Sequence, residues 1–398
     1  MTSGERSHLL AVSRFARAAD RLVAWSWSSG LNDRPPLDPA YLWAVGARGF
    51  ERADEISIRS EEDVADFRER LDVLCRSLRE EAALNALGHT MAYGQITGAI
   101  RKRHALGRLW REKPELAATP IATPIAVIGQ MRSGTTRLQR LLATDPTHAG
   151  TRFCDSHDPV PRQPDLRPLR ARAALALARR VNPWLDTLHP FGATRTDEEI
   201  GWLQCALSAC SFEAQWRIPA FVAHNEGSDP APVYREFARI LRTDAAARGN
   251  GDRPRVLKCP QFAEDLPGFC DSFPEARLVV ARRDRADVLA STVSMVAAQS
   301  AFQSDSRDAD AIEKEWRRKI ALRERRMSDG LERFEGPVAE VAFDRLNADW
   351  QAVVEDIYAA LGLDLDRAAM SGMATEVERA SNGQHRAHAG QLHRFAQG

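Results

Sequence analysis

Short apolar runs alternate with helical patterns along most of the chain. After the first run, Leu138, Leu141 and Leu142 recur three and four residues apart, which is the spacing of one helix face. Similar stretches separate the later runs. The runs that predict strands are Ile125–Ile128, Val256–Lys258, Leu278–Ala281 and Val338–Phe343. This alternation predicts an α/β fold, in which a parallel sheet is covered by helices on both faces.

The part of the chain that precedes the first strand has a different character. Residues up to about 116 are predicted to be mostly helical, and a proline-bearing stretch before Ile125 predicts a linker. The segment 9–27 carries Arg14, Arg17, Asp20 and Arg21 and predicts an amphipathic helix. We expect this helix to pack on the main domain, with a role at a membrane surface as the alternative.

These patterns predict two parts: a helical N-terminal region, 1–121, and an α/β domain, 122–398. The second part contains a helical insertion at about 160–250, with predicted helices at Arg170–Val181 and Glu198–Trp216. Because this insertion lies between the first and the later strands, we expect it to help form a substrate pocket.

The loop after the first apolar run has the features of an anion-binding turn. Gly129 and Gly134 bracket it, and the predicted helix follows at once. Such a loop aims backbone N–H groups at one point, and the helix dipole favours negative charge there. The glycine spacing is that of a nucleotide-binding P-loop, but Thr135 and Thr136 stand where that motif has Lys followed by Ser or Thr. The basic residue is Arg132, whose planar guanidinium suits charged oxygens.

Two further basic residues stand at predicted strand ends. Lys258 closes the second run, and Arg283 follows the third. Ser291 comes eight residues after Arg283, on a predicted helix for which Asp284 is a suitable N-cap. Ligands of open parallel sheets bind at the carboxyl ends of the strands. We therefore expect these side chains near the glycine loop.

Three of these segments resemble the donor site of the sulfotransferases. The family's 5′-phosphosulfate loop, in its bacterial and tyrosylprotein-type form, is similar to the segment Arg132, Ser133, Gly134, Thr135 and Thr136. The family's 3′-phosphate site is similar to the pair Arg283 and Ser291. Its Leu-Lys-Ser-Pro segment is similar to the residues around Lys258, with Cys259 in place of the serine.

Two weaker similarities follow toward the C-terminus. The residues 343–346 resemble the family's Tyr-Glu-Asp-Leu strand end. The residues 382–388 resemble a segment that closes over the donor, but Gln384 and Arg386 depart from that pattern.

The resemblance implies a P-loop-type sheet and an enzyme that moves a sulfuryl group to a hydroxyl or amine acceptor. The implied donor is 3′-phosphoadenosine 5′-phosphosulfate (PAPS), and no metal is implied. Arg132 and Lys258 would then act on the sulfuryl group and the leaving phosphate, and Arg283 and Ser291 would hold the 3′-phosphate. The 5′-phosphate would be cradled by Ser133, Gly134, Thr135 and Thr136. Such a transfer is expected to proceed in line and to depend on positioning and charge stabilisation.

The general base is expected to be Asp155. Tyrosylprotein-type enzymes use a glutamate on the segment after their first helix, and Asp155 falls near that place with a shorter side chain. A base must come within hydrogen-bond reach of the acceptor. The alternatives are His157, His189, Glu198 and Glu199.

Composition limits the classes of partner. The 398 residues contain 55 Lys and Arg and 55 Asp and Glu, so the net charge is zero. A neutral chain has no overall attraction to nucleic acid or to an anionic membrane. We therefore expect no nucleic-acid partner. The resemblance to the sulfotransferases implies a small-molecule, glycan or lipid acceptor.

Cysteine usage and hydropathy predict a cytoplasmic location. The six cysteines form no Cys-x-x-Cys pair and, together with the histidines, show no metal-ligand spacing. Reduced thiols are the simplest expectation. The first residues lack the hydrophobic core of a signal peptide, and no apolar run has the length of a membrane span.

Two other functions stay open. A P-loop kinase or NTPase would bind ATP with Mg²⁺, but it would carry a lysine after Gly134. A protein that binds a nucleotide without turnover, or that acts as an interaction module, would retain the loop without a base. The acceptor and the oligomeric state are not predicted.

Overall fold

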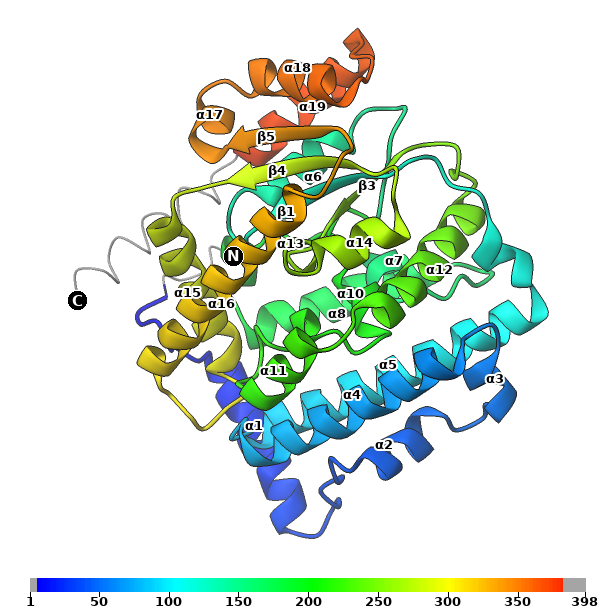
Figure 1. The fold of residues 1–398 in the computed structure, drawn as a ribbon. Helices are drawn as coiled ribbons and strands as arrows, with labels where there is room; N and C mark the ends of the chain where they lie inside the picture. Colours follow the sequence, from blue (N-terminus) through cyan, green and yellow to red (C-terminus); the bar gives the residue numbers. More distant parts are fainter. Residues whose placement is uncertain (1–5, 382–398) are drawn as a thin grey trace.

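The computed structural model describes residues 6–381 and contains a five-stranded parallel sheet flanked by helices (Figure 1). All neighbouring strands pair in parallel, in the order β2-β3-β1-β4-β5. The strands are β1 (Ile125–Gly129), β2 (Ala149–Gly150), β3 (Arg255–Lys258), β4 (Arg277–Arg282) and β5 (Val338–Ala342). The α/β class and the helical N-terminal region predicted from the sequence are confirmed.

The strand order reverses at β1, which lies between β3 and β4. Val127 is in register with Lys258, and Gly129 is in register with Ala281. The carboxyl ends of these three strands therefore meet at one edge of the sheet. In doubly wound sheets, a crevice opens at such a reversal because the following connections run to opposite sides.

Successive residues of β1 bury opposite faces of the sheet. Ile125 and Val127 belong to one hydrophobic cluster, and Ala126 and Ile128 belong to another. Alternation of side chains along a strand produces this division. The cluster around Ile125 is covered by α6 (Thr135–Leu142), α18 (Trp350–Leu361) and α19 (Arg367–Ser381). The opposite cluster is covered by α10 (Ile200–Gln204), α12 (Ala231–Arg248), α13 (Gln261–Glu264), α14 (Leu266–Ser272) and α16 (Ala309–Leu331).

Most of the remaining helices lie below this second layer or along its sides, whereas α17 (Phe343–Ala348) lies beside β5 and α18 (Figure 1). The N-terminal region contains α1 (Arg14–Ser28), α2 (Pro39–Gly46), α3 (Arg52–Ile56), α4 (Glu61–Glu80), α5 (Ala86–Glu112) and the 3₁₀ helix η1 (Pro114–Ala118). The others are α7 (Phe153–His157), α8 (Arg167–Val181), α9 (Leu185–Leu188), η2 (Ala209–Ser211), α11 (Pro219–Gly227) and α15 (Arg285–Ser300). None of the helices within residues 6–381 is both long enough and apolar enough to cross a bilayer.

Hydrophobic packing is continuous across residue 121, where the sequence predicts a boundary. Trp110 of α5 belongs to the cluster that covers the sheet, and its indole N–H donates a 2.8 Å hydrogen bond to Thr243. A further cluster joins α2, α4 and α5 to the insertion, through residues such as Phe212 and Phe221. The division into 1–121 and 122–398 stays a prediction.

The single helix predicted over Glu198–Trp216 is wrong. The helix α10 ends at Gln204, and Leu207 adopts a left-handed φ of 53°. The Ser208 N–H then bonds back to the Leu203 carbonyl, a pattern that closes helix C-termini. Glycine usually marks such an end, and none stands here, so the sequence carries no sign of the break.

A buried cluster of ion pairs joins the N-terminal region to α12. Glu236 accepts hydrogen bonds from Arg59 at 2.7 and 2.9 Å and lies 3.7 Å from Arg103. All three side chains are almost fully buried. Removal of the carboxylate would leave two guanidinium groups desolvated without a counter-charge.

We therefore expect E236A to lower the free energy of unfolding by about 3–5 kcal/mol, as measured by urea denaturation. The control is E62A, because Glu62 is exposed and pairs with the partly exposed Arg235. Its loss should cost under about 1 kcal/mol. Equal losses in the two variants would contradict this role of Glu236.

Candidate functional site

The loop between β1 and α6 is a tight turn with two left-handed residues. Arg132 has a φ of 70°, and Gly134 has a φ of 91°. The Ser133 hydroxyl donates a 2.6 Å hydrogen bond to the Gln130 carbonyl, which also accepts the Ser133 N–H. These bonds hold the loop folded over the start of α6.

The first turn of α6 presents unpaired donors. The N–H groups of Gly134, Thr135 and Thr136 donate to no acceptor in the part of the chain that the structure describes. The first N–H groups of a helix have no partner within the helix, and the helix dipole makes this end positive. An anion at this point would accept these donors.

Phe343, the first residue of α17 directly after β5, lies against the loop at Gly134. A β-carbon on Gly134 would lie 2.6 Å from Cδ2 of Phe343, so only glycine fits there without a shift. The Arg283 guanidinium lies 4.5 Å from the centre of the same ring. The sequence does not pair Phe343 with Gly134. The sequence marks Phe343 only by its place at the end of a predicted strand and by the resemblance of residues 343–346 to the Tyr-Glu-Asp-Leu strand end of the sulfotransferases.

The structure brings Arg132, Arg283 and Ser291 together. Nε of Arg132 donates a 2.9 Å hydrogen bond to the Ser291 hydroxyl, and Nη1 donates a 2.5 Å bond to the Leu188 carbonyl. Nη1 of Arg283 in turn donates a 2.9 Å bond to the Arg132 carbonyl. Residues from the loop, the turn after β4, α15 and α9 therefore form one cluster. Asp284 caps α15 as predicted. Nothing in the sequence pointed to Leu188.

The Arg132 guanidinium is desolvated, and no carboxylate compensates it. Its side chain is half-buried and forms no ion pair with any of residues 6–381. Desolvation and the neighbouring Arg283 lower the pKa of Arg132 to about 10, although Glu198 acts in the opposite direction. Nε of Arg283 is buried and has no hydrogen-bond partner among the described residues. Two close cations with unused donors fit a phosphate or a sulfate group.

Lys258 lies at the end of β3, where the sequence placed it. Its Nζ donates a 2.5 Å hydrogen bond to Glu198, and its backbone N–H donates a 2.8 Å bond to Glu199. Complete burial raises the pKa of Glu199 to about 8, so this carboxyl is mainly neutral at pH 7. The cluster thus contains three cations, Arg132, Lys258 and Arg283. The charged carboxylates beside them are Glu198 and the exposed Asp287, so an excess of positive charge remains.

The structure places Asp155 in a separate cluster of arginines. Its carboxylate accepts from Arg152 at 2.6 Å and from Arg248 at 2.7 Å, and lies 3.2 Å from Arg167. Burial alone would raise the pKa of Asp155, but the guanidinium groups outweigh it and hold the pKa below its usual value. A fully buried carboxylate with three cationic partners is a poor proton acceptor. This geometry disfavours the expected role of Asp155 as the base.

Among the alternatives, Glu198 has the most suitable surroundings. His189 pairs with Asp197 at 3.0 Å, and His157 packs on a phenylalanine ring. Glu199 is buried beneath Lys258. Glu198 is partly exposed, contacts Lys258 and lies near enough to Arg132 to affect its pKa.

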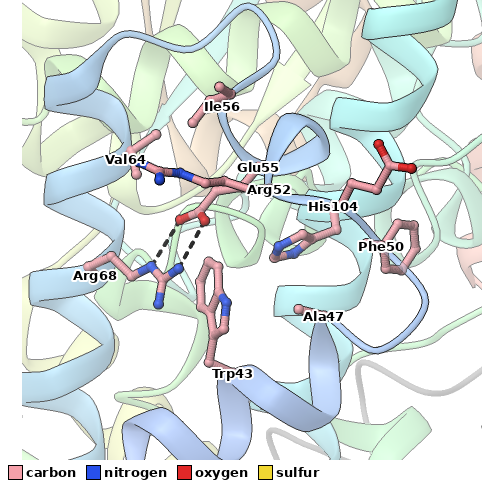
Figure 2. Close-up of a pocket in the computed structure, with 10 residues that line it drawn as sticks. Trp43, Ala47, Phe50, Arg52, Glu55, Ile56, Val64, Arg68 and His104 are labelled. Carbon is pink, nitrogen blue, oxygen red and sulfur yellow. Dashed lines mark hydrogen bonds and ion pairs between the residues drawn. The ribbon is translucent and has the colours of Figure 1, made fainter.

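A cavity of about 440 Å³ lies apart from this cluster, in the N-terminal region. Figure 2 shows Arg68 between Glu55 and Trp43, with two hydrogen bonds of 2.9 Å to the Glu55 carboxylate. The guanidinium lies 3.0 Å from the centre of the Trp43 ring. None of the predicted donor-site residues lines this cavity, so we do not assign the donor to it.

The predicted donor-site residues lie along one edge of the sheet, where three of its strands end. They lie at the carboxyl ends of β1, β3 and β4 or on the helices that follow these strands. The residues are Arg132, Ser133, Gly134, Thr135, Thr136, Lys258, Arg283 and Ser291. The segment 382–388 lies outside the described residues. Within residues 6–381, no group of three or more His, Cys, Asp and Glu side chains is arranged to hold a metal ion.

We expect G134A to destabilise the protein more than G249A does. Both glycines have positive φ, but a β-carbon at Gly249 meets no atom within 4 Å. Backbone strain in G249A should cost about 1 kcal/mol. In G134A the contact with Phe343 should add about 1–3 kcal/mol, which urea denaturation would measure. Equal costs would show that Phe343 does not confine the loop.

Comparison with known proteins agrees with this fold. The chain superimposes on sulfotransferase STF1 from Mycobacterium tuberculosis H37Rv with a TM-score of 0.77 and 24% identity, over 92% of this chain and 100% of that one. STF9 from Mycobacterium avium gives a TM-score of 0.77 and 17% identity, over 88% and 90%. No curated protein matches significantly. The family model described as "Sulfotransferase family" matches residues 124–367, which is more than half of the sequence. The chain therefore belongs to the sulfotransferase family.

Proposed function

We propose that this protein transfers a sulfuryl group from PAPS to a hydroxyl or amine acceptor. The observation that carries the proposal is the uncompensated guanidinium of Arg132, which shares its cluster with Arg283 and Ser291. A donor with phosphate groups at its 3′ and 5′ positions offers two anions to such a cluster. Membership of the sulfotransferase family supports sulfotransfer.

Different residues of the cluster would bind the two phosphate groups of the donor. The unpaired N–H groups of Gly134, Thr135 and Thr136, with the Ser133 side chain nearby, would hold the 5′-phosphate. Arg283 and Ser291 would hold the 3′-phosphate. Among residues 6–381, Arg283 contacts a backbone carbonyl, an exposed aspartate and an aromatic face. A charge-assisted hydrogen bond to a phosphate would be stronger than these contacts.

Catalysis would depend on charge stabilisation during in-line transfer. Negative charge develops on the oxygen between sulfur and the leaving phosphate, and fixed cations stabilise it. Arg132 and Lys258 are the cations that we assign to this task. Both have restricted freedom, since Arg132 is fixed by Ser291 and Leu188, and Lys258 is held at 2.5 Å from Glu198. Fixed donors need little reorganisation when the charge develops.

We assign the general base to Glu198 in place of Asp155. Glu198 is the partly exposed carboxylate beside Lys258, whereas Asp155 is enclosed by arginines. The acceptor would be a small molecule, a glycan or a lipid headgroup, and we propose a cytoplasmic location and no nucleic-acid partner.

Calorimetry with adenosine 3′,5′-bisphosphate and with ATP, each with and without Mg²⁺, tests the donor site. We expect the bisphosphate to bind without Mg²⁺ and more tightly than ATP. R283A should weaken bisphosphate binding by about 10-fold to 100-fold, because a hydrogen-bonded charge pair is lost. Its effect on ATP should be much smaller. Tight binding of ATP alone would favour a kinase or NTPase.

The matched control is R282A. Arg282 is the neighbouring residue on β4, and it pairs with Glu340 at 2.9 Å on the solvent side. We expect bisphosphate affinity in R282A to stay within about two-fold of the parent protein, in keeping with an exposed pair. Equal losses in R282A and R283A would contradict the assignment of the 3′-phosphate.

The base assignment can be tested with E198Q and D155N. Because amides do not accept the proton, we expect E198Q to reduce transfer of labelled sulfuryl groups to acceptors in a cell extract by about 10²–10⁴-fold. Bisphosphate affinity should change little. D155N should instead lower the free energy of unfolding, since it weakens three ion pairs. Loss of turnover in D155N at full stability, with turnover retained in E198Q, would restore Asp155 as the base.

Retention of bisphosphate binding without any sulfated product would favour a different function. The protein would then be a nucleotide-binding protein without turnover. Mass spectrometry of the same extract, incubated with labelled donor and purified protein, would identify the acceptor directly.

A further inference from the structure

Exposed large apolar side chains gather on two contacting helices. Ten such residues are exposed in the described chain, and seven of them lie on α1 and α8 or within three residues of their ends. The seven are Phe15, Leu22, Trp25, Leu31, Leu166, Leu169 and Leu177. The two helices meet where the Ser13 hydroxyl donates a 2.8 Å hydrogen bond to the Val181 carbonyl. We call the exposed sides of α1 and α8 the α1–α8 face.

The orientation of α1 is fixed by its contacts with α5. Asp20 accepts a 3.0 Å hydrogen bond from the Leu87 N–H, and the Trp27 ring contacts His89. The opposite side of α1 carries Phe15, Leu22 and Trp25, spaced seven and three residues apart. Leu22 is 64% exposed and Trp25 is 56% exposed. A stable element of the fold therefore presents this apolar stripe outward.

α8 repeats this arrangement. Ala171 and Leu175 are buried in a small cluster with Cys154, which fixes one side of the helix against the protein. Leu169 and Leu177, eight residues apart, are 58% and 55% exposed on the other side. Exposed leucines at helical spacing form a second outward stripe.

Arginines that form no ion pair with any described residue flank both stripes. Exposed guanidinium groups belong to Arg14, Arg17, Arg21, Arg172 and Arg180. None of the five forms an ion pair with residues 6–381, although most arginines elsewhere in the fold do. The sequence outside that range contains one acidic residue, Glu5. The α1–α8 face is therefore both apolar and strongly basic in a chain of zero net charge.

We propose that the α1–α8 face docks on an anionic phospholipid surface. Helices that lie in a membrane interface combine Trp, Phe and Leu on one side with Arg or Lys beside them. The apolar side chains enter the headgroup boundary, and the basic ones contact lipid phosphates. A second copy of this chain is a poorer occupant, because a two-fold interface sets each patch against itself and would bring unpaired arginines together.

A short segment of the chain connects the α1–α8 face with the proposed donor site. The chain leaves α8, passes through α9 and reaches Leu188, whose carbonyl holds Arg132. The docking surface and the donor loop are therefore connected by one short segment. The docking proposal does not depend on the proposed sulfotransfer.

Sedimentation of the full-length protein with vesicles tests the proposal. We expect binding to vesicles that contain about one third phosphatidylglycerol, and little binding to pure phosphatidylcholine. R17E/R21E should weaken the partition coefficient by at least about 25-fold, since each basic residue near an anionic surface contributes roughly five-fold. L22S/W25S should weaken it by at least about ten-fold through loss of buried apolar area. Higher salt should weaken binding by the parent protein.

Matched variants elsewhere separate docking from general effects. R253E/R325E makes the same change of charge at exposed arginines on other elements, and I56S/I58S removes exposed apolar side chains outside the α1–α8 face. Both controls should bind vesicles within about three-fold of the parent protein, as expected for residues that do not touch the membrane. Thermal unfolding should show that all four variants fold.

Three results would overturn the proposal. One is equal weakening by R17E/R21E and R253E/R325E. Another is equal binding to the neutral and the anionic vesicles. The third is sedimentation-equilibrium evidence that the free protein forms a dimer which L22S/W25S dissociates, because the face would then be covered by a second copy.

Discussion

The desolvated guanidinium of Arg132 is the group around which the site is built. A cation that loses water usually gains a carboxylate in return. Within residues 6–381, Arg132 gains only a hydroxyl from Ser291 and a carbonyl from Leu188, and Arg283 lies close to it. Each of these neighbours belongs to a different element, so the fold keeps a desolvated positive charge without a compensating carboxylate at one position. The anionic donor that we propose would compensate this charge.

The sheet topology explains why this uncompensated positive charge lies at the ends of the strands. β1 sits between β3 and β4, so their carboxyl ends deliver the loop, Lys258 and Arg283 to one edge. The insertion then returns over this edge and supplies Leu188 and Glu198. Phe343, directly after β5, lies against both Gly134 and Arg283 and so links β5 to the same point. The parallel sheet thus gathers groups that are more than 150 residues apart in the chain.

Local features of the site could be predicted from the sequence, and long-range partners could not. Apolar runs, glycines and the Asp284 cap are properties of short segments, so four of the five strands, the loop and the start of α15 were predicted close to their observed places. The two-residue strand β2 has no apolar run and was not predicted. The surroundings of Asp155 depend on three arginines from separate elements, which no spacing relates. For the same reason the sequence could not rank Glu198 above its alternatives. The end of α10 was missed because Leu207 adopts a conformation that usually requires glycine.

Net charge is a poor guide to this molecule because charges act over short distances. At physiological salt, interactions between exposed charges fade within roughly 8–10 Å. A total of zero can therefore contain regions of strong local sign. Buried clusters such as Glu264 with Lys319 and Arg323 are closely paired and contribute little field outside. The arginines of the α1–α8 face form no ion pair with residues 6–381, and neither they nor the cluster around Arg132 are cancelled in this way. Composition alone argues against an anionic partner, but the positions of the charges provide two places where anions would be stabilised.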